Sequence, residues 1–189
     1  MIFIISGQTA SGKTSLALLL AKLLQYQRLI SHTTRPMRIG ETNGVEYHFI
    51  SNAQLNETNL ICKNTFHTAY GPWTYGLDIE GIDENKHHIA ILEAAGAVEL
   101  KSNIPSAKII YIDVPETIRR ERAYVRENKQ FDPEIERRFK ADAEDFTGFE
   151  NKADLTVLNI NFQDCVQQIK NYIEQSIGRD GVGNDKIRS

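Results

Sequence analysis

A glycine-rich run near the N-terminus carries the clearest chemistry in the sequence, because it fits the pattern G-x-x-x-x-G-K-[ST] at every position. An apolar run at 2–5 precedes it, and a Leu- and Ala-rich stretch at 15–25 follows it. A strand, a loop and a helix in this order let backbone N–H groups surround a polyphosphate. Lys13 can reach the outer phosphates, and the hydroxyl of Thr14 can bind Mg²⁺. The residues expected to hold the polyphosphate here are Gly7, Gln8, Thr9, Ala10, Ser11, Gly12, Lys13, Thr14 and Ser15.

Two arginines, Arg35 and Arg38, lie in the polar, turn-rich segment that comes next, with Tyr47 a few residues further on. Guanidinium groups three residues apart on a turn can clamp one phosphate through paired hydrogen bonds. One phosphorylated ligand would bind the loop and a second would bind the clamp. Phosphoryl transfer between nucleotides needs this arrangement. The alternative is that the two arginines lie at the surface and pair with Glu41 or Glu46, and that Tyr47 only packs.

Two predicted helices carry a third group of basic residues: Arg119, Arg120, Arg122, Arg126, Arg137 and Arg138. Several of them recur at spacings of three or four residues, which places them on one face of a helix. We interpret Arg119 and Arg120 as part of a solvent-exposed face with acidic partners nearby, which is the ordinary role of such a pattern.

The order of the predicted elements shows how these residues can meet. Strands are expected at 2–5, 28–31, 45–50, 88–92, 107–114 and 153–158. Helices are expected at 15–25, at 115–128, from 132 onwards, and through an apolar stripe at 166–177. Strands that alternate with helices predict an α/β fold, in which helices flank a parallel sheet and the ligand site lies at the carboxyl ends of its strands. The segment 33–83 lacks this alternation and is expected to be a small, inserted β-rich lobe.

Length and composition limit the possible classes of protein. A chain of 189 residues with a net charge of −3 can form one globular domain, but it carries no basic field that would attract nucleic acid. No apolar run approaches the length of a membrane span, and no signal peptide is recognisable. Cys62 and Cys165 are too few for a zinc site or a disulfide framework. We expect a cytoplasmic protein without a nucleic-acid or membrane partner, either a monomer or a weak homodimer.

The segment 31–50 resembles the signature of the guanylate kinase family. The matching positions are Thr33, Thr34, Arg35, Arg38, Glu41, Gly44, Tyr47 and Phe49. The resemblance covers nearly the whole chain, from the glycine loop to the Val-Leu-Asn sequence at 157–159. It implies one domain at 1–177 and a flexible tail at 178–189. Within the domain it implies a P-loop core at 1–32 and 84–177, a lobe for the monophosphate at 33–83, and an arginine-bearing helical lid at about 122–138.

The resemblance also implies roles for individual residues. The acceptor GMP would be bound by Ser31, Arg35, Arg38, Tyr47, Tyr75 and Glu93. The polyphosphate of the loop at 7–15 would be that of ATP, and the ATP site would also include Arg122 and Asn159. The catalytic residues would be Lys13, Arg35, Arg126 and Arg138. Arginines of the lid neutralise the charge on the transferring phosphoryl group. The choice of Arg138 over Arg137 depends on an insertion in the alignment. Asn159 could instead belong to a turn or a helix cap at the end of a strand.

The sequence departs from the family pattern where a base would be read. The usual acidic pair D-x-D-x-x-G appears as Glu93-Ala94-Ala95-Gly96. Phe66 stands near the position of a glutamate that reads guanine, and Leu77 replaces a usual Ser or Thr. The alternative is that Thr65, His67 or a carbonyl near Gly71 restores these contacts after a shift in alignment.

We therefore predict an ATP- and Mg²⁺-dependent nucleoside monophosphate kinase with GMP as its acceptor. The alternatives are a P-loop kinase for another acceptor, such as a dNMP or a ribosyl phosphate, and a non-catalytic guanylate-kinase-like binding module.

Overall fold

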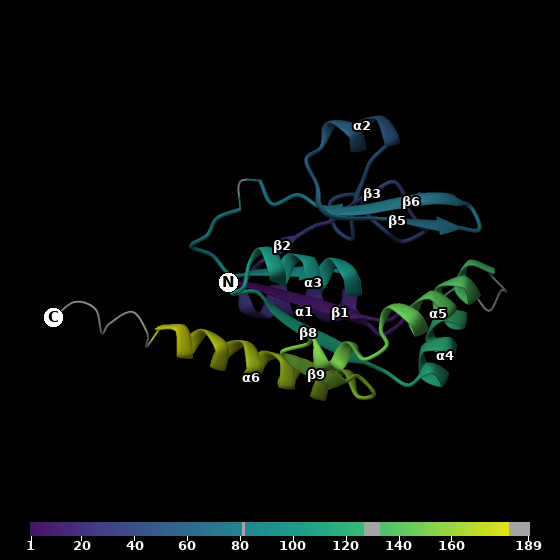
Figure 1. Cartoon of the computed structure of the whole chain (residues 1–189). Helices are drawn as coiled ribbons and strands as arrows, with labels where there is room; N and C mark the ends of the chain where they lie inside the picture. Colours follow the sequence, from purple (N-terminus) through teal and green to yellow (C-terminus); the bar gives the residue numbers. More distant parts are fainter. Residues whose placement is uncertain (81, 127–132, 182–189) are drawn as a thin grey trace.

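The computed structural model describes residues 1–80, 82–126 and 133–181, with side chains as far as 178. Its larger sheet contains five parallel strands in the order β2-β7-β1-β8-β9 (Figure 1). These strands are β1 (Ile2–Gly7), β2 (Gln27–Leu29), β7 (His88–Ile91), β8 (Lys108–Asp113) and β9 (Leu155–Leu158). The predicted α/β fold with a parallel sheet is confirmed.

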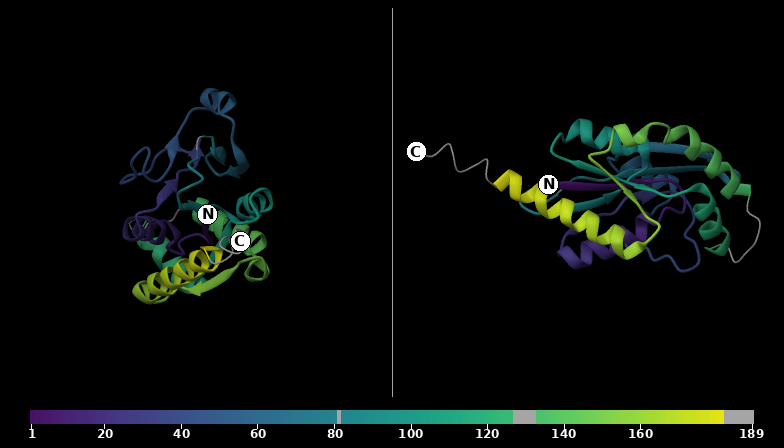
Figure 2. Two further views of the ribbon diagram at one scale, coloured as in Figure 1. Left: turned by 90° about the vertical axis from the view of Figure 1, so that its left-hand side faces the viewer. Right: turned by 90° about the horizontal axis from the view of Figure 1, so that it is seen from below.

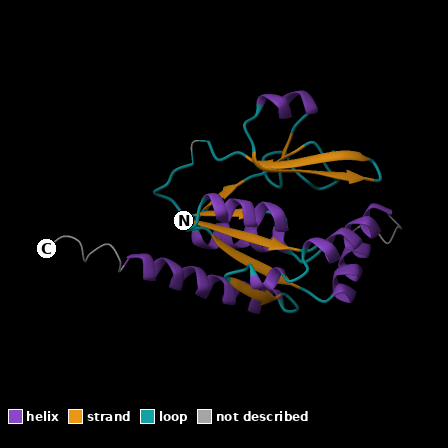
Figure 3. Ribbon diagram, in the orientation of Figure 1, coloured by secondary structure: helices purple, strands orange, loops and turns teal. Residues whose placement is uncertain are grey.

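Helices cover both faces of the larger sheet (Figure 3). They are α1 (Lys13–Leu24), α3 (Ala94–Asn103) and α6 (Phe162–Gly181). Side chains alternate along β1, so Phe3 and Ile5 pack with α1 and α6, whereas Ile2 and Ile4 pack with α3. All six residues of β1 are buried, as its continuous apolar run predicts. The strand therefore anchors the glycine loop, which follows directly at its carboxyl end, to two cores.

A smaller, four-stranded sheet stands to one side of the larger one (Figure 2). Its strands are β3 (His32–Thr33), β4 (His48–Phe49), β5 (Ile61–Thr68) and β6 (Gly71–Leu77), and α2 (Asn52–Glu57) lies between β4 and β5 in the chain. The predicted strand at 45–50 is wrong in its length. Tyr47 contributes its carbonyl to a turn by accepting a 2.8 Å bond from the N–H of Gly44, so only two residues remain for β4.

Two further helices, α4 (Glu116–Arg126) and α5 (Pro133–Asp145), lie near the carboxyl ends of the central strands (Figure 1). The short helix η1 (Phe149–Asn151) then leads to β9. Part of the predicted lid, 127–132, lies outside the described residues. Helix α6 continues to Gly181, past the predicted start of the tail at 178, and the rest of that tail also lies outside the described residues. Within the described part of the chain, no helix is both long and apolar enough to cross a bilayer.

Candidate active site

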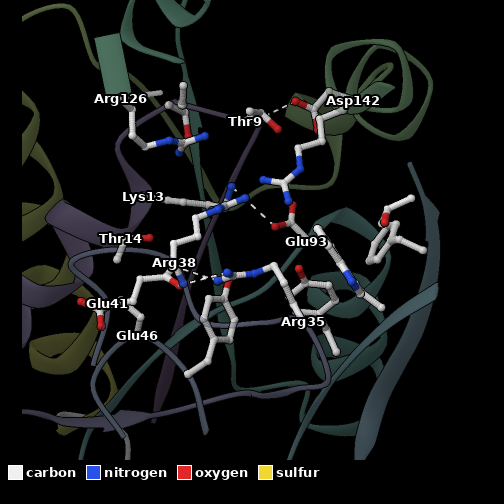
Figure 4. A pocket seen from close by; sticks show the side chains of 18 of the residues that line it. Thr9, Lys13, Thr14, Arg35, Arg38, Glu41, Glu46, Glu93, Arg126 and Asp142 are labelled. Atoms are coloured by element: carbon white, nitrogen blue, oxygen red, sulfur yellow. Dashed lines mark hydrogen bonds and ion pairs between the residues drawn. The ribbon is translucent and has the colours of Figure 1, made fainter. Parts of the chain in front are cut away.

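A pocket of about 800 Å³ lies between the glycine loop, the smaller sheet and helices α4 and α5 (Figure 4). The three groups of chemically distinctive residues, which are far apart in sequence, meet in this one space. Its lining includes these predicted site residues: Thr9, Ala10, Ser11, Gly12, Lys13, Thr14, Ser15, Arg35, Arg38, Tyr47, Tyr75, Glu93, Arg122, Arg126 and Arg138.

The two glycines that frame the loop are required by its close packing. A Cβ atom on Gly7 would lie 2.7 Å from the carbonyl oxygen of Ile112, too close to be tolerated without a shift of the backbone. Gly12 has φ +90°, and a Cβ there would lie 2.7 Å from Nδ2 of Asn159. Helix α1 begins directly afterwards at Lys13, and the first N–H groups of a helix have no partner within it. The loop is therefore shaped to present backbone N–H groups to an anion.

Lys13 is held along the loop by oxygen atoms on either side. Its Nζ lies 3.4 Å from the carbonyl oxygen of Gln8 and 3.6 Å from Oε1 of Glu93 (Figure 4). Glu93 follows β7 at the N-terminus of α3, and the hydroxyl-bearing Thr14 also lines the pocket. No group of three His, Cys, Asp or Glu side chains able to hold a metal occurs among the described residues. The hydroxyl of Thr14 and the carboxylate of Glu93 are oxygen groups of the type that a hard divalent cation takes as ligands.

Arg35 is paired with Glu41, as the alternative interpretation anticipated, but the pair is not at the surface. Arg35 is 3% exposed, and its two terminal nitrogens lie 2.9 and 2.8 Å from the two carboxylate oxygens. Its guanidinium also lies 5.4 Å from the ring of Tyr47 and 5.3 Å from that of Phe49. Glu41 accepts a further bond of 2.7 Å from the backbone N–H of Arg38. The pair therefore shapes the turn that presents Arg38, and direct binding of phosphate by Arg35 stays a prediction.

Arg38 lies at the centre of a cluster of cations. Burial, together with the positive charges of Arg138, Arg35 and Arg126, lowers the pKa of Arg38 to about 10, against the opposing effect of Glu41. Burial is the larger cause and the neighbouring guanidinium groups add to it, so the charge of Arg38 gains from an anion placed beside it. Figure 4 shows Arg38 directed towards Lys13 and the glycine loop. This arrangement is that of an anion site facing the loop.

Aromatic rings wall the pocket beside this cluster. Tyr47 and Phe66 each meet Tyr75 edge-on, with ring centroids 5.7 Å apart in both pairs. Burial raises the pKa of Tyr47, so its hydroxyl remains protonated and able to donate a hydrogen bond. Trp73 also lines the pocket, and the guanidinium of Arg138 lies 5.9 Å from its ring.

Four predicted ligand-binding residues do not line the pocket: Gly7, Gln8, Ser31 and Asn159. Ser31 is buried, and its hydroxyl donates a long bond of 3.5 Å to the carbonyl oxygen of Ile91. Asn159 is 1% exposed, and its amide donates a 2.8 Å bond to the carbonyl oxygen of Ser11 in the glycine loop. Arg122 in turn donates a 2.9 Å bond to the backbone carbonyl of Asn159. Asn159 thus supports the loop from behind, and this burial argues against a direct contact with an adenine base.

The prediction of a solvent-exposed Arg119 is wrong, because its guanidinium lies inside the molecule. Arg119 is 4% exposed, donates a 3.0 Å bond to the carbonyl oxygen of Val114, and lies 3.6 Å from a carboxylate oxygen of Asp142. Arg120, by contrast, is exposed as predicted and pairs with Glu116 and Glu136.

The sequence reasoning missed two acidic residues of helix α5. Asp142 lines the pocket and accepts a short bond of 2.6 Å from the backbone N–H of Thr9 in the glycine loop. Burial raises the pKa of Asp142, against the opposing effects of the Thr9 N–H and Lys13. The only signal in the sequence was its position three residues after Phe139, on the buried side of the helix.

Glu134 is the second missed residue, and it connects α5 to the smaller sheet. It is 2% exposed and accepts bonds from Arg137 and Arg138. It also accepts a 3.2 Å bond from the backbone N–H of Ala69, at the tip of the β5–β6 hairpin. Nothing in the local sequence indicates this bond, because its two ends are far apart in the chain.

Comparisons with known proteins agree with this geometry. The family pattern described as Guanylate kinase matches residues 1–176. A guanylate kinase of Shewanella denitrificans is 30% identical over 182 residues, which cover 91% of this chain and 86% of that protein. A guanylate kinase of Neisseria gonorrhoeae is 36% identical over 122 residues, which cover 60% of this chain but only 58% of that protein.

A solved structure supports the same fold. The guanylate kinase of Anaplasma phagocytophilum superimposes with a TM-score of 0.70 at 20% identity, covering 93% of this chain and 85% of that one. The fold, the glycine loop and the matched residues therefore agree, and the chain belongs to the guanylate kinase family.

Proposed function

We propose that the protein is a nucleoside monophosphate kinase that transfers the γ-phosphoryl group of ATP to GMP and so forms ADP and GDP. The observation that carries this proposal is a single pocket in which the loop of Lys13 faces the cationic cluster of Arg38, Arg126 and Arg138. Phosphoryl transfer between nucleotides needs two phosphate sites that face each other. GMP as the acceptor is supported by relatives named guanylate kinase.

The loop and helix α1 bind the donor. Backbone N–H groups from Gly12 to Ser15 hold the phosphates of ATP, and the partial positive charge at the start of α1 adds to their attraction. Lys13 stabilises the negative charge of the outer phosphates, and binding an anion in place of Glu93 costs it little because that ion pair is long at 3.6 Å. Mg²⁺ supplies further charge neutralisation when it is bound with the nucleotide, and Thr14 is the residue placed to hold it.

The turn of Arg38 binds the phosphate of the acceptor. Arg38 is held in place by Glu41, which fixes its backbone, and Tyr47 and Tyr75 add hydroxyl groups on the same side of the pocket. Arg126 and Arg138 enter from helices α4 and α5 and neutralise the charge that spreads over the phosphoryl oxygens during transfer. Each group is pre-oriented by the fold, which is the main source of catalysis in phosphoryl transfer.

We place the acceptor lobe at 33–83 and the lid at about 122–138, both as parts of one domain at 1–177. The partners of the protein are small nucleotides, in a cytoplasmic setting, and the chain acts as a monomer or a weak homodimer. A non-catalytic binding module is the less favoured hypothesis, because a protein that only binds a partner needs neither the loop lysine nor a Mg²⁺-binding hydroxyl.

The test is ADP formation by the purified protein with GMP, dGMP, AMP, CMP, UMP and ribosyl phosphates as acceptors. We expect the highest kcat/KM with GMP, and no detectable turnover by Lys13→Ala, since that residue supplies charge rather than packing. Lys22→Ala, an exposed cation on the same helix, is the matched control and should retain full activity. Folded wild-type protein that forms no ADP with any acceptor would identify a binding module, and a preference for a ribosyl phosphate would identify a different kinase.

A further inference from the structure

A buried pair of charges links helices α4 and α5 to the backbone of the glycine loop. Oδ2 of Asp142 in α5 accepts a 2.6 Å bond from the N–H of Thr9. Nη1 of Arg119 in α4 lies 3.5 Å from the carbonyl oxygen of the same Thr9, and 3.6 Å from Oδ2 of Asp142. Both polar ends of one loop residue are therefore bonded to two different helices.

The positions of these two residues relate them to the arginines expected to act in catalysis. Arg119 precedes Arg126 by seven residues, which is two turns of α4, so both lie on one side of that helix. Asp142 follows Arg138 by four residues and shares one side of α5 with it. A shift of either helix relative to the loop would consequently move the catalytic arginines away from the transferring phosphate.

Core packing alone does not account for the pair. Removing two charges from water is costly, and well-packed apolar side chains of similar volume are often at least as stabilising. The contact between the helices has a second, independent source, since Arg120 of α4 and Glu136 of α5 form an exposed ion pair 2.8 Å long. The distinguishing feature of the buried pair is that its bonds end on the glycine loop.

We propose that Asp142 and Arg119 are positioning residues, which fix Arg126 and Arg138 relative to the glycine loop. This inference rests on the proposed kinase function, because those two arginines are assigned through it. Asp142 acts through the backbone of Thr9 and through Arg119.

The primary test compares Asp142→Asn with Glu136→Gln. The first change keeps the shape of the side chain and removes the buried charge, and the second removes the exposed charge that joins the same two helices. We expect Asp142→Asn to lower kcat by roughly ten- to a hundredfold. The KM for ATP should stay unchanged or fall, because a negative charge near the phosphates is lost. Glu136→Gln should remain within about twofold of the wild type in kcat.

Further measurements separate a positioning role of Asp142 from a general loss of folded protein. The binding stoichiometry for ADP, measured by calorimetry, should remain one in Asp142→Asn, which excludes a simple loss of folded protein. Arg119→Met should lower kcat in the same way, and the double variant should lose no more than the more severe single variant, because the two residues act as one unit. A kcat for Asp142→Asn within about twofold of the wild type, a stoichiometry well below one, or additive losses would each overturn the proposal.

A second readout does not depend on turnover. Trp73 is the single tryptophan of the chain, and the guanidinium of Arg138 lies 5.9 Å from its ring. Displacement of Arg138 should therefore alter the emission of Trp73 in Asp142→Asn and leave it unchanged in Glu136→Gln. Unchanged emission in both variants would overturn the proposal even if the wild type is an active kinase. A wild type without kinase activity would refute the proposed function instead, and the emission of the two variants would still decide whether Asp142 positions Arg138.

Discussion

Burial and the neighbouring cations Arg138, Arg35 and Arg126 disfavour the charge of Arg38, against the opposing effect of Glu41. Arg38→Ala should therefore raise the KM for the acceptor by about ten- to a hundredfold, because a charge-assisted bond to phosphate is lost. The KM for ATP should change little. The same substitution should raise the melting temperature of the ligand-free protein, since it relieves repulsion. Steady-state kinetics and thermal unfolding check the two expectations.

A matched comparison separates these effects from a general loss of positive charge. Lys22→Ala removes an exposed cation from α1 and should alter neither KM nor the melting temperature. A change in the KM for ATP alone in Arg38→Ala would show that the two phosphate sites are assigned the wrong way round.

Strand β5 contributes an aromatic ring and a hydroxyl group to the wall of the pocket. Phe66 and Thr68 line the pocket from β5. Because side chains alternate along a strand, Thr65 and His67 point to the opposite face of the smaller sheet. The hydroxyl of Thr65 is bonded to that of Thr74 at 2.8 Å. The alternative in which Thr65 or His67 restores guanine recognition is therefore not favoured.

Discrimination between guanine and adenine should consequently be weak. A site that hydrogen-bonds a base rejects analogues because its own polar groups are left unpaired, and an aromatic wall imposes no such penalty. We expect a ratio of kcat/KM for GMP over AMP below about 10². Phe66→Glu should raise this ratio at least tenfold, since a carboxylate can accept both N–H groups of guanine, whereas Phe66→Leu should not. A wild-type ratio above about 10⁴ would contradict the expectation.

At the scale of the elements, Glu134 links helix α5 to the β5–β6 hairpin through a hydrogen bond from the N–H of Ala69. Burial alone would raise the pKa of Glu134, but bonds from Arg137, Arg138 and the N–H of Ala69 lower it from 4.5 to about 2. A lowered pKa means that the carboxylate stabilises the folded protein above about pH 4.5, and that this contribution disappears as the pH falls towards 2. The link between α5 and the hairpin should therefore be lost at low pH before the core unfolds.

Glu134→Gln tests this expectation. At pH 7 the substitution should lower the free energy of unfolding by about 1–3 kcal/mol, because bonds to charged groups are weakened. The difference from the wild type should shrink as the pH is lowered from 4.5 towards 2 in urea titrations. The exposed Glu136→Gln serves as a control and should show an effect of less than about 1 kcal/mol. A difference independent of pH would exclude the assigned role of Glu134.

Sequence patterns predicted those elements whose signals are local. The strand, loop and helix around Lys13, the buried strands β7 and β8 and the stripe of α6 all followed from apolar periodicity. The strand expected at 45–50 was cut short by a turn at Gly44, which alternation alone does not reveal. Local signals thus locate elements better than they locate their ends.

The same distinction between local and tertiary signals applies to the residues of the candidate site. Lys13 and Arg38 were predicted by motifs within short segments, and both line the pocket. Arg119 was misread and Asp142 and Glu134 were missed, because their roles depend on which distant backbone groups the fold brings near them. A residue on an amphipathic helix has many possible partners, and only the tertiary arrangement selects one.

At the scale of the whole molecule, the smaller sheet packs on the core beside α3 through Cys62 and Leu77, and meets helix α5 at its other end. The smaller sheet reaches α5 through the N–H of Ala69 on Glu134 and through Trp73 beside Arg138. Contacts this limited can open and re-form, which would admit the nucleotides and then exclude water from the transferring phosphoryl group. We therefore expect the smaller sheet and helices α4 and α5 to close together only when both proposed phosphate sites are filled.

Small-angle scattering with a bisubstrate analogue tests this closure. The analogue joins the two phosphate sites with one polyphosphate and neutralises the repulsion among Arg38, Arg126 and Arg138, so the radius of gyration should fall on binding. ADP alone fills only the loop and leaves that repulsion in place, so it should cause a smaller change. Trp73 emission should follow the same order, because its ring lies beside Arg138. Equal compaction by ADP and by the analogue would show that the cationic cluster does not control closure.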